Sequence, residues 1–275
     1  MSRSHQRHKR GQRRDRAVGI LLTIIGCIAV GALVAAGWWL RSTRVETVEN
    51  TLCPKAGPQA VHALIFDRTD PVTPQQALQV EQYVNRLVST ARAGERFDIY
   101  TVEGDTERLL TPVIEICSPG QGKDANALYQ NPKRIQEKFD DRFSEVLRNR
   151  VKQLLQPSRR DSSPIIESLR AAAIESFGPF DQRAVPAELT IISDMVQHSP
   201  LDSHVRSTPN FSKLSKSQAW RSLQPDLRGA KIEVLYVLRP SAVRGGVPIQ
   251  NRGHQLFWEE LVTAANGRLM SIQPI

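Results

Sequence analysis

Residues 62–73 read HALIFDRTDPVT, an apolar run that ends abruptly in polar residues and a proline. A short apolar run bounded by turn residues is typical of a buried strand. Asp67, Thr69 and Asp70 follow the run directly, and Pro71 comes next. A strand that delivers two carboxylates and a hydroxyl to one turn is compatible with an ordinary exit loop, a nucleophile or a metal-binding loop. The neighbouring segments decide which of these is favoured.

Strands and helices alternate on either side of this stretch. Thr73 begins a helix, because Pro74 stands in its first turn and Gln76 completes a capping box. Further strands are expected at residues 96–102, 109–116, 187–193, 230–238 and 268–272, and further helices at 135–154, 165–176 and 255–265, with a short helix near 212–223. This alternation predicts an α/β three-layer sandwich with a mostly parallel sheet. The link 103–108 is too short for a helical crossover, so the strands at 96–102 and 109–116 should pair antiparallel at an edge.

The N-terminal segment has the character of a membrane anchor. Residues 17–40 carry no charge and, as a helix, are long enough to cross the hydrocarbon core. Residues 1–16 hold seven Lys or Arg and one Asp, which is +6 of the chain's net charge of +9. Trp38 and Trp39 lie at the other end, where interfacial aromatics are common.

These features predict a cytoplasmic tail (1–16), a transmembrane helix in the lipid bilayer (17–40), a linker (41–58) and an extracytoplasmic domain (59–275). The bacterial inner membrane is the expected location, and topology explains the basic tail without a nucleic-acid partner. A cleaved signal peptide is the alternative, but its apolar region is usually only about 7–15 residues long.

Three polar loops that lie far apart in the sequence should meet at one edge of the sheet. Asp67 and Thr69 follow the first strand, Ser163 precedes the helix at 165–176, and Asp194 follows the strand at 187–193. Ligands of open α/β sheets bind at the carboxyl ends of the strands. The convergence therefore marks this edge as the candidate functional site.

The three loops resemble those of the von Willebrand factor A domain, over roughly Val61 to the C-terminus. DRTDP resembles that family's Asp-x-Ser/Thr-x-Ser first loop, SSPIIESL its Thr-Pro-hydrophobic loop, and ISDM its Ile-Ser-Asp-Gly turn. The resemblance implies a metal-ion-dependent adhesion site in which Asp67, Thr69, Ser163 and Asp194 hold Mg²⁺ or another divalent cation. An acidic group on a partner protein would then complete the coordination of the ion.

Pro71 departs from this pattern, because it stands where the third first-loop residue should be a hydroxyl and its side chain cannot coordinate a cation. Hard divalent cations prefer oxygen ligands, which Thr69, Ser163 and the two acids still offer. A weakened metal site and a fold that has lost its metal both remain open. Asp70 is interpreted as a turn-former before the proline.

Cys53 and Cys117 form a candidate disulfide. Cys53 precedes the first strand and Cys117 ends the antiparallel one, so both belong at the opposite edge of the sheet, in a compartment that permits disulfides. The resemblance places one strand between theirs, a lateral gap of roughly 9–10 Å that loops must close. Whether the two cysteines are bonded therefore depends on the conformation of these loops.

The sequence favours a binding module over an enzyme. We expect a membrane-anchored protein-binding module with a protein partner in or near the membrane; the sequence does not identify that partner. A metal-free scaffold or assembly factor of a cell-envelope complex is the second hypothesis. A metal-assisted phosphoester hydrolase is the least favoured, since Thr69 occupies the position of that class's second aspartate and no Gly-x-Ser-x-Gly elbow is present.

Overall fold

A computed structural model describes residues 4–42, 45–102, 111–126, 130–156, 161–178 and 185–275, with side chains described from residue 19 to 38 and from 45 onward. The chain divides into two compact units, Met1–Glu46 and Thr47–Ile275. The first contains α1 (Ser4–Ser42), in which Gly19–Trp38 is long and apolar enough to cross a membrane, with a mean hydropathy of 2.5. A membrane anchor and a signal sequence both have these properties.

The second unit is built on a mixed sheet of six strands in the order β3-β2-β1-β4-β5-β8. The strands are β1 (Ala60–Asp67), β2 (Glu95–Val102), β3 (Ile114–Cys117), β4 (Ala187–Ser193), β5 (Lys231–Tyr236) and β8 (Arg268–Pro274). All neighbours pair parallel except β2 and β3, which pair antiparallel at one edge. The predicted fold class is therefore confirmed. The link 103–108, whose shortness suggested the antiparallel pair, lies outside the described residues.

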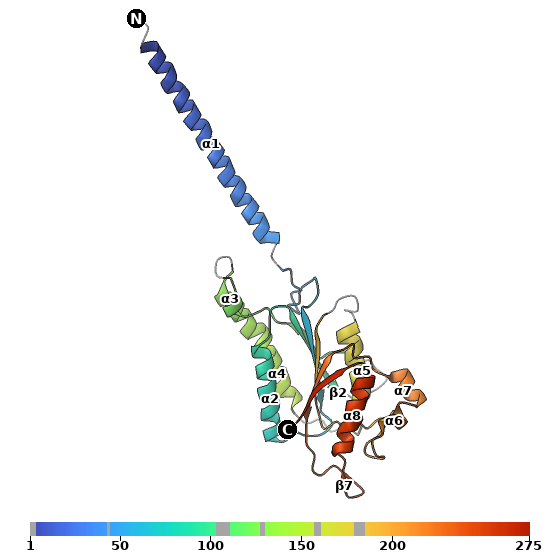
Figure 1. Cartoon of the computed structure of the whole chain (residues 1–275). Coiled ribbons are helices and arrows are strands. Elements are labelled where there is room, and N and C mark those ends of the chain that lie inside the picture. Colours follow the sequence, from blue (N-terminus) through green and yellow to red (C-terminus); the bar gives the residue numbers. More distant parts are fainter. Residues whose placement is uncertain (1–3, 43–44, 103–110, 127–129, 157–160, 179–184) are drawn as a thin grey trace. The chain divides into compact units, whose positions relative to one another are not determined.

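Helices cover both faces of the sheet (Figure 1). One face carries α2 (Pro74–Ser89) and a long helix made of α3 (Pro132–Phe139), the π-turn η2 (Asp140–Ser144) and α4 (Glu145–Leu154). The other carries α5 (Ile165–Ala172), its π-helical extension η3 (Ala173–Phe177), α8 (Arg252–Ala264) and the short α6 (Phe211–Leu214) and α7 (Gln218–Leu223). A 3-10 turn, η1 (Gly122–Asp124), and a small hairpin of β6 (Val243–Arg244) and β7 (Val247–Pro248) complete the described elements.

The central strand β1 explains why the sheet is covered on both faces. Ala63 and Ile65 pack into the core under α5 and α8, whereas Leu64 and Phe66 pack under α2 and α4. A strand buried on both faces reads as a continuous apolar run rather than an alternating one. The HALIF run therefore folds as its composition predicted and delivers Asp67 at the carboxyl end of the strand.

Several helix boundaries differ from the prediction. The single helix expected over 135–154 is interrupted by η2, and the short helix expected near 212–223 is divided into α6 and α7. The division occurs at Ser217, whose side chain accepts a hydrogen bond from the Trp220 amide and so starts a new helix. The Thr73 capping box is present as predicted. Pro157, the expected end of the long helix, lies outside the described residues.

Cys53 and Cys117 are joined by a disulfide, with their Cα atoms 4.7 Å apart. Residues 47–54 close the gap by folding back on themselves, because the Val48 amide donates to the Cys53 carbonyl and the Leu52 amide to the Val48 carbonyl. The Cys117 amide also donates to the Thr51 carbonyl, at 2.8 Å. The segment before β1 thus lies beside β3 rather than leading straight into the first strand.

Candidate functional site

Asp67 joins the three polar loops at the carboxyl edge of the sheet. Its Oδ2 accepts hydrogen bonds from the Ser163 hydroxyl at 3.1 Å and from the Ser193 hydroxyl at 2.7 Å. The loop before α5 is also tied to the loop after β4, because Ser163 and His198 exchange backbone hydrogen bonds of 2.8 and 2.9 Å. Loops that lie 96 and 126 residues beyond Asp67 in the sequence therefore form one continuous surface with it.

The other oxygen of Asp67 holds its own loop in place. Oδ1 accepts from the Thr69 amide at 3.0 Å and from the Thr69 hydroxyl at 2.7 Å. Hydrogen bonds between a side chain and the backbone two residues away stabilise a turn outside helices and strands. Thr69 is 6% exposed and Ser163 is 6% exposed, so both hydroxyls are buried and each directs its proton towards Asp67.

Asp194 is the most perturbed acid at this edge. Its side chain is buried, and Oδ1 accepts from the Val196 amide at 2.8 Å. Burial raises the pKa of Asp194 to about 7; the negative charge of Asp67 adds to this, the Val196 amide and the Arg239 guanidinium oppose it, and the charge of Asp70 raises it further. The site therefore holds an acid that is costly to ionise even with the Arg239 guanidinium beside it.

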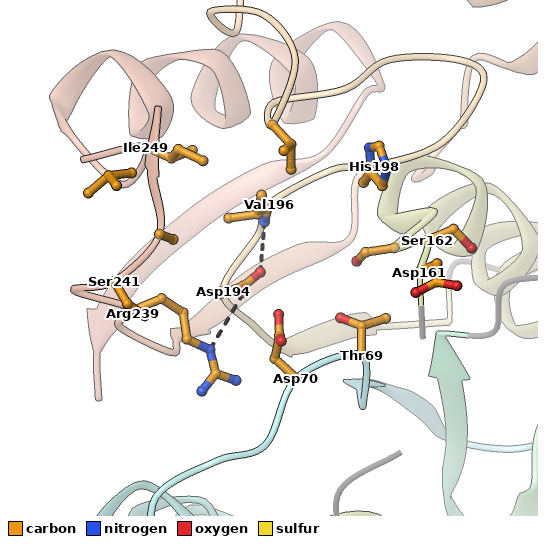
Figure 2. Close-up of a pocket in the computed structure, with 14 residues that line it drawn as sticks. Thr69, Asp70, Asp161, Ser162, Asp194, Val196, His198, Arg239, Ser241 and Ile249 are labelled. Atoms are coloured by element: carbon orange, nitrogen blue, oxygen red, sulfur yellow. Dashed lines mark hydrogen bonds and ion pairs between the residues drawn. The ribbon is translucent and has the colours of Figure 1, made fainter. Parts of the chain in front are cut away.

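Arg239 supplies a positive charge at this position. Its Nε lies 3.6 Å from Asp194 Oδ2, and its Nη1 donates to the carbonyl of Pro71. Figure 2 shows the guanidinium reaching between Asp194 and the loop that carries Asp70. The arginine follows β5 and so belongs to a fourth loop at the same edge, one that the sequence reasoning did not include.

A pocket of about 370 Å³ opens above these residues (Figure 2). Its lining includes Thr69, Asp70, Asp161, Ser163, Asp194, His198 and Arg239, together with apolar side chains from the β6 region. The structure thus brings all four predicted ligands, Asp67, Thr69, Ser163 and Asp194, to one edge, and Asp70 faces the same pocket. Ser193 of the ISDM turn also lies here and donates to Asp67, and the structure adds Arg239, which no motif indicated.

The same geometry can be tested against a divalent cation. Thr69 and Ser163 donate their protons to Asp67 and keep lone pairs that suit such an ion. Pro71 offers only its carbonyl, which already accepts from Arg239, and the guanidinium places a fixed positive charge beside Asp194. Within the described ranges, no three His, Cys, Asp or Glu side chains come together to hold a metal. The engaged carbonyl of Pro71 and the charge of Arg239 therefore both act against a divalent cation beside Asp194.

The chain matches no protein-family model and no curated protein. Among solved structures it is similar to an aerotolerance-related membrane protein from Bacteroides fragilis, with 13% identity, 78% of this chain and 92% of that one covered, and a TM-score of 0.36. It is also similar to the manganese-loaded TRAP protein of Plasmodium vivax (11% identity, 72% and 62% covered, TM-score 0.32). A third is a von Willebrand factor type A protein from Catenulispora acidiphila, with 15% identity, 76% of this chain and 42% of that one covered, and a TM-score of 0.33. These likenesses concern the fold alone, and the fold assignment rests on the order and direction of the strands.

Proposed function

We propose that this chain is a membrane-anchored protein-binding module that recognises its partner with the carboxyl edge of the sheet. The observation that carries the proposal is that the Asp67 carboxylate accepts four hydrogen bonds, which hold three loops together in one pre-formed surface. A pre-formed surface binds at a lower entropic cost than loops that must order on contact. Binding rather than catalysis is favoured, because the hydroxyls of Thr69, Ser163 and Ser193 all donate to a carboxylate that is already fully engaged.

Anchoring is the second part of the proposal. Gly19–Trp38 would cross the bilayer, with the basic residues before it in the cytoplasm and the domain on the other side, in a bacterial inner membrane. The Cys53–Cys117 bond supports an oxidising compartment for the domain. The intact mass of the chain extracted from membranes tests this: an anchor keeps residues 1–40, whereas a cleaved signal removes them.

Site-specific crosslinking tests the binding edge. Val243 lines the pocket and is 53% exposed, whereas Val146 on α4 is 40% exposed on another surface. A photoreactive p-benzoyl-phenylalanine at Val243 in the membrane-embedded full chain should give a protein adduct that Asp67→Ala removes. The same probe at Val146 should not give it. Equal adducts at both positions, or an adduct indifferent to Asp67→Ala, would contradict the proposal.

The alternatives differ in their dependence on metal. A module that recognised an acidic group through Mg²⁺ would lose its partner when a chelator is added, whereas a metal-free scaffold or assembly factor would keep it. The contacts of Pro71 and Arg239 favour the metal-free version. The phosphoester hydrolase remains the least favoured; turnover of a generic phosphoester that Asp67→Asn abolishes would restore it.

A further inference from the structure

We infer that Arg239 is a built-in cation that takes the place of a divalent ion at this edge of the sheet, so that the site excludes divalent metals and functions without them. The inference rests on the proposed function for the location of the binding surface. It concerns a residue of this chain rather than an added group, and it follows from three independent features of the loops.

The first feature is the charge that the fold gathers at one point. Asp67 ends β1, Asp194 follows the adjacent strand β4, and Asp70 lines the same pocket as Asp194. A positive charge at this point offsets the negative charge of these acids. The Arg239 guanidinium supplies that charge, since its Nε lies 3.6 Å from Asp194 Oδ2 and its side chain is only 17% exposed.

The second feature is that the arginine is held in position. The Oε1 of Gln250 accepts a hydrogen bond from the Arg239 amide at 2.6 Å. The Nε2 of Gln250 donates to the carbonyls of Asp194 at 3.0 Å and Val237 at 2.8 Å. One side chain thus ties the backbone of Arg239 to that of the acid it neutralises. The guanidinium is placed by the fold and does not reach the site as a loose surface side chain.

The third feature is the contact between the two residues that depart from a metal-binding pattern. Pro71 replaces a hydroxyl in the first loop, and Arg239 brings a positive charge from the loop after β5. They meet in one hydrogen bond, in which Arg239 Nη1 donates to the Pro71 carbonyl. The residue that removes a metal ligand therefore also supplies an acceptor for the cation that replaces the metal.

The hydroxyls of Thr69 and Ser163 provide the basis of a decisive test. Both still donate to Asp67 with lone pairs to spare, so the framework should accept a divalent ion once Arg239 is removed and a hydroxyl is restored. The double variant Pro71→Ser/Arg239→Ala makes these two changes. A matched control, Pro71→Ser/Arg239→Lys, restores the hydroxyl but keeps a positive charge.

Mn²⁺ binding to the full chain in detergent, read from the EPR signal of the free ion, measures the effect. We expect no saturable binding to the wild type and only weak binding to the lysine control. The Pro71→Ser/Arg239→Ala variant should bind one Mn²⁺ per chain, at least about tenfold more tightly than the control, because a fixed positive charge has been removed. Adding Asp67→Ala to that variant should abolish the binding.

Two results would overturn the inference. One is saturable, Asp67-dependent Mn²⁺ binding by the wild type, and the other is a folded Pro71→Ser/Arg239→Ala variant that binds no better than the lysine control. Circular dichroism establishes that each variant is folded, and Pro71→Ser/Arg239→Gln replaces the alanine variant if that one is not. Crosslinking at Val243 is read separately, so loss of the proposed partner and failure of metal exclusion remain distinguishable.

Discussion

His62 should make the stability of the domain fall at alkaline pH. The residue lies in β1 with its imidazole between two acids of the adjacent strands, 3.7 Å from Glu95 and 3.3 Å from Glu188. The ring also stacks on Phe97, with 4.8 Å between centroids. Only 15% of the side chain is exposed, so solvent screens these contacts weakly.

The size of the effect follows from the pKa of the imidazole. Burial alone would lower it, but hydrogen bonds and charges from Glu188 and Glu95 outweigh burial and raise the pKa of His62 from 6.5 to about 9. The difference of about 2.5 corresponds to roughly 3.4 kcal/mol at 1.36 kcal/mol per pKa unit. Glu188 is 40% exposed, and solvent screening reduces the expected contribution to about 2 kcal/mol.

The sign of the effect follows from the raised pKa. The folded state binds the proton more tightly than the unfolded chain, so the contribution is fully present below pH 6.5 and is lost as the pH rises through about 9. Urea unfolding of the full chain in detergent at pH 6 and at pH 9.5, for the wild type and His62→Gln, measures it. The wild type should lose about 2 kcal/mol more than the variant over this interval. Equal pH dependence in the two proteins would refute the reasoning.

Two further changes test other parts of the fold. Replacing Cys53 and Cys117 with serine should lower the free energy of unfolding by about 4 kcal/mol, because the bond spans 64 residues of chain. Urea unfolding with and without reductant checks this, because reductant should destabilise only the wild type. A variant that unfolds at the same urea concentration as the oxidised wild type would contradict the prediction. Gly122→Ala should cost about 1–3 kcal/mol, because the new Cβ would lie 2.4 Å from the Pro132 carbonyl oxygen. Gly178→Ala, with nothing within 4 Å of its Cβ, is the matched control and should change stability by less than about 0.5 kcal/mol.

The fold was predictable where one physical signal dominated. The apolar run before Asp67 required a strand buried on both faces, and the alternation of strands with helices required a parallel sheet. The positions of Asp67 and Asp194 followed, because the carboxyl ends of parallel strands share one edge. The order and direction of the strands thus indicated which edge of the sheet would carry the site and which acids would lie there.

Arg239 could not be identified in this way. It stands three residues beyond β5, in a loop without periodicity, and its direction depends on the hydrogen bonds of Gln250. Its position past a central strand placed it at the same edge, but arginines are common in surface loops and no spacing marked this one. Ser193 was expected at this edge as part of the ISDM turn, but its hydrogen bond to Asp67 could not be predicted, because the partner of a serine that ends a strand depends on how the loops fold.

The Cys53–Cys117 bond also determines how the domain responds to force. A force applied to the N-terminal helix enters the second unit at residue 47. It is transmitted along the backbone to Cys53 before it reaches β1. There the load divides, because one branch continues along the backbone into β1 and the other crosses the disulfide to the end of β3. Tension applied through the N-terminal segment is thereby shared between a central and an edge strand. The strand that carries Asp67 is protected from being drawn out of the sheet alone.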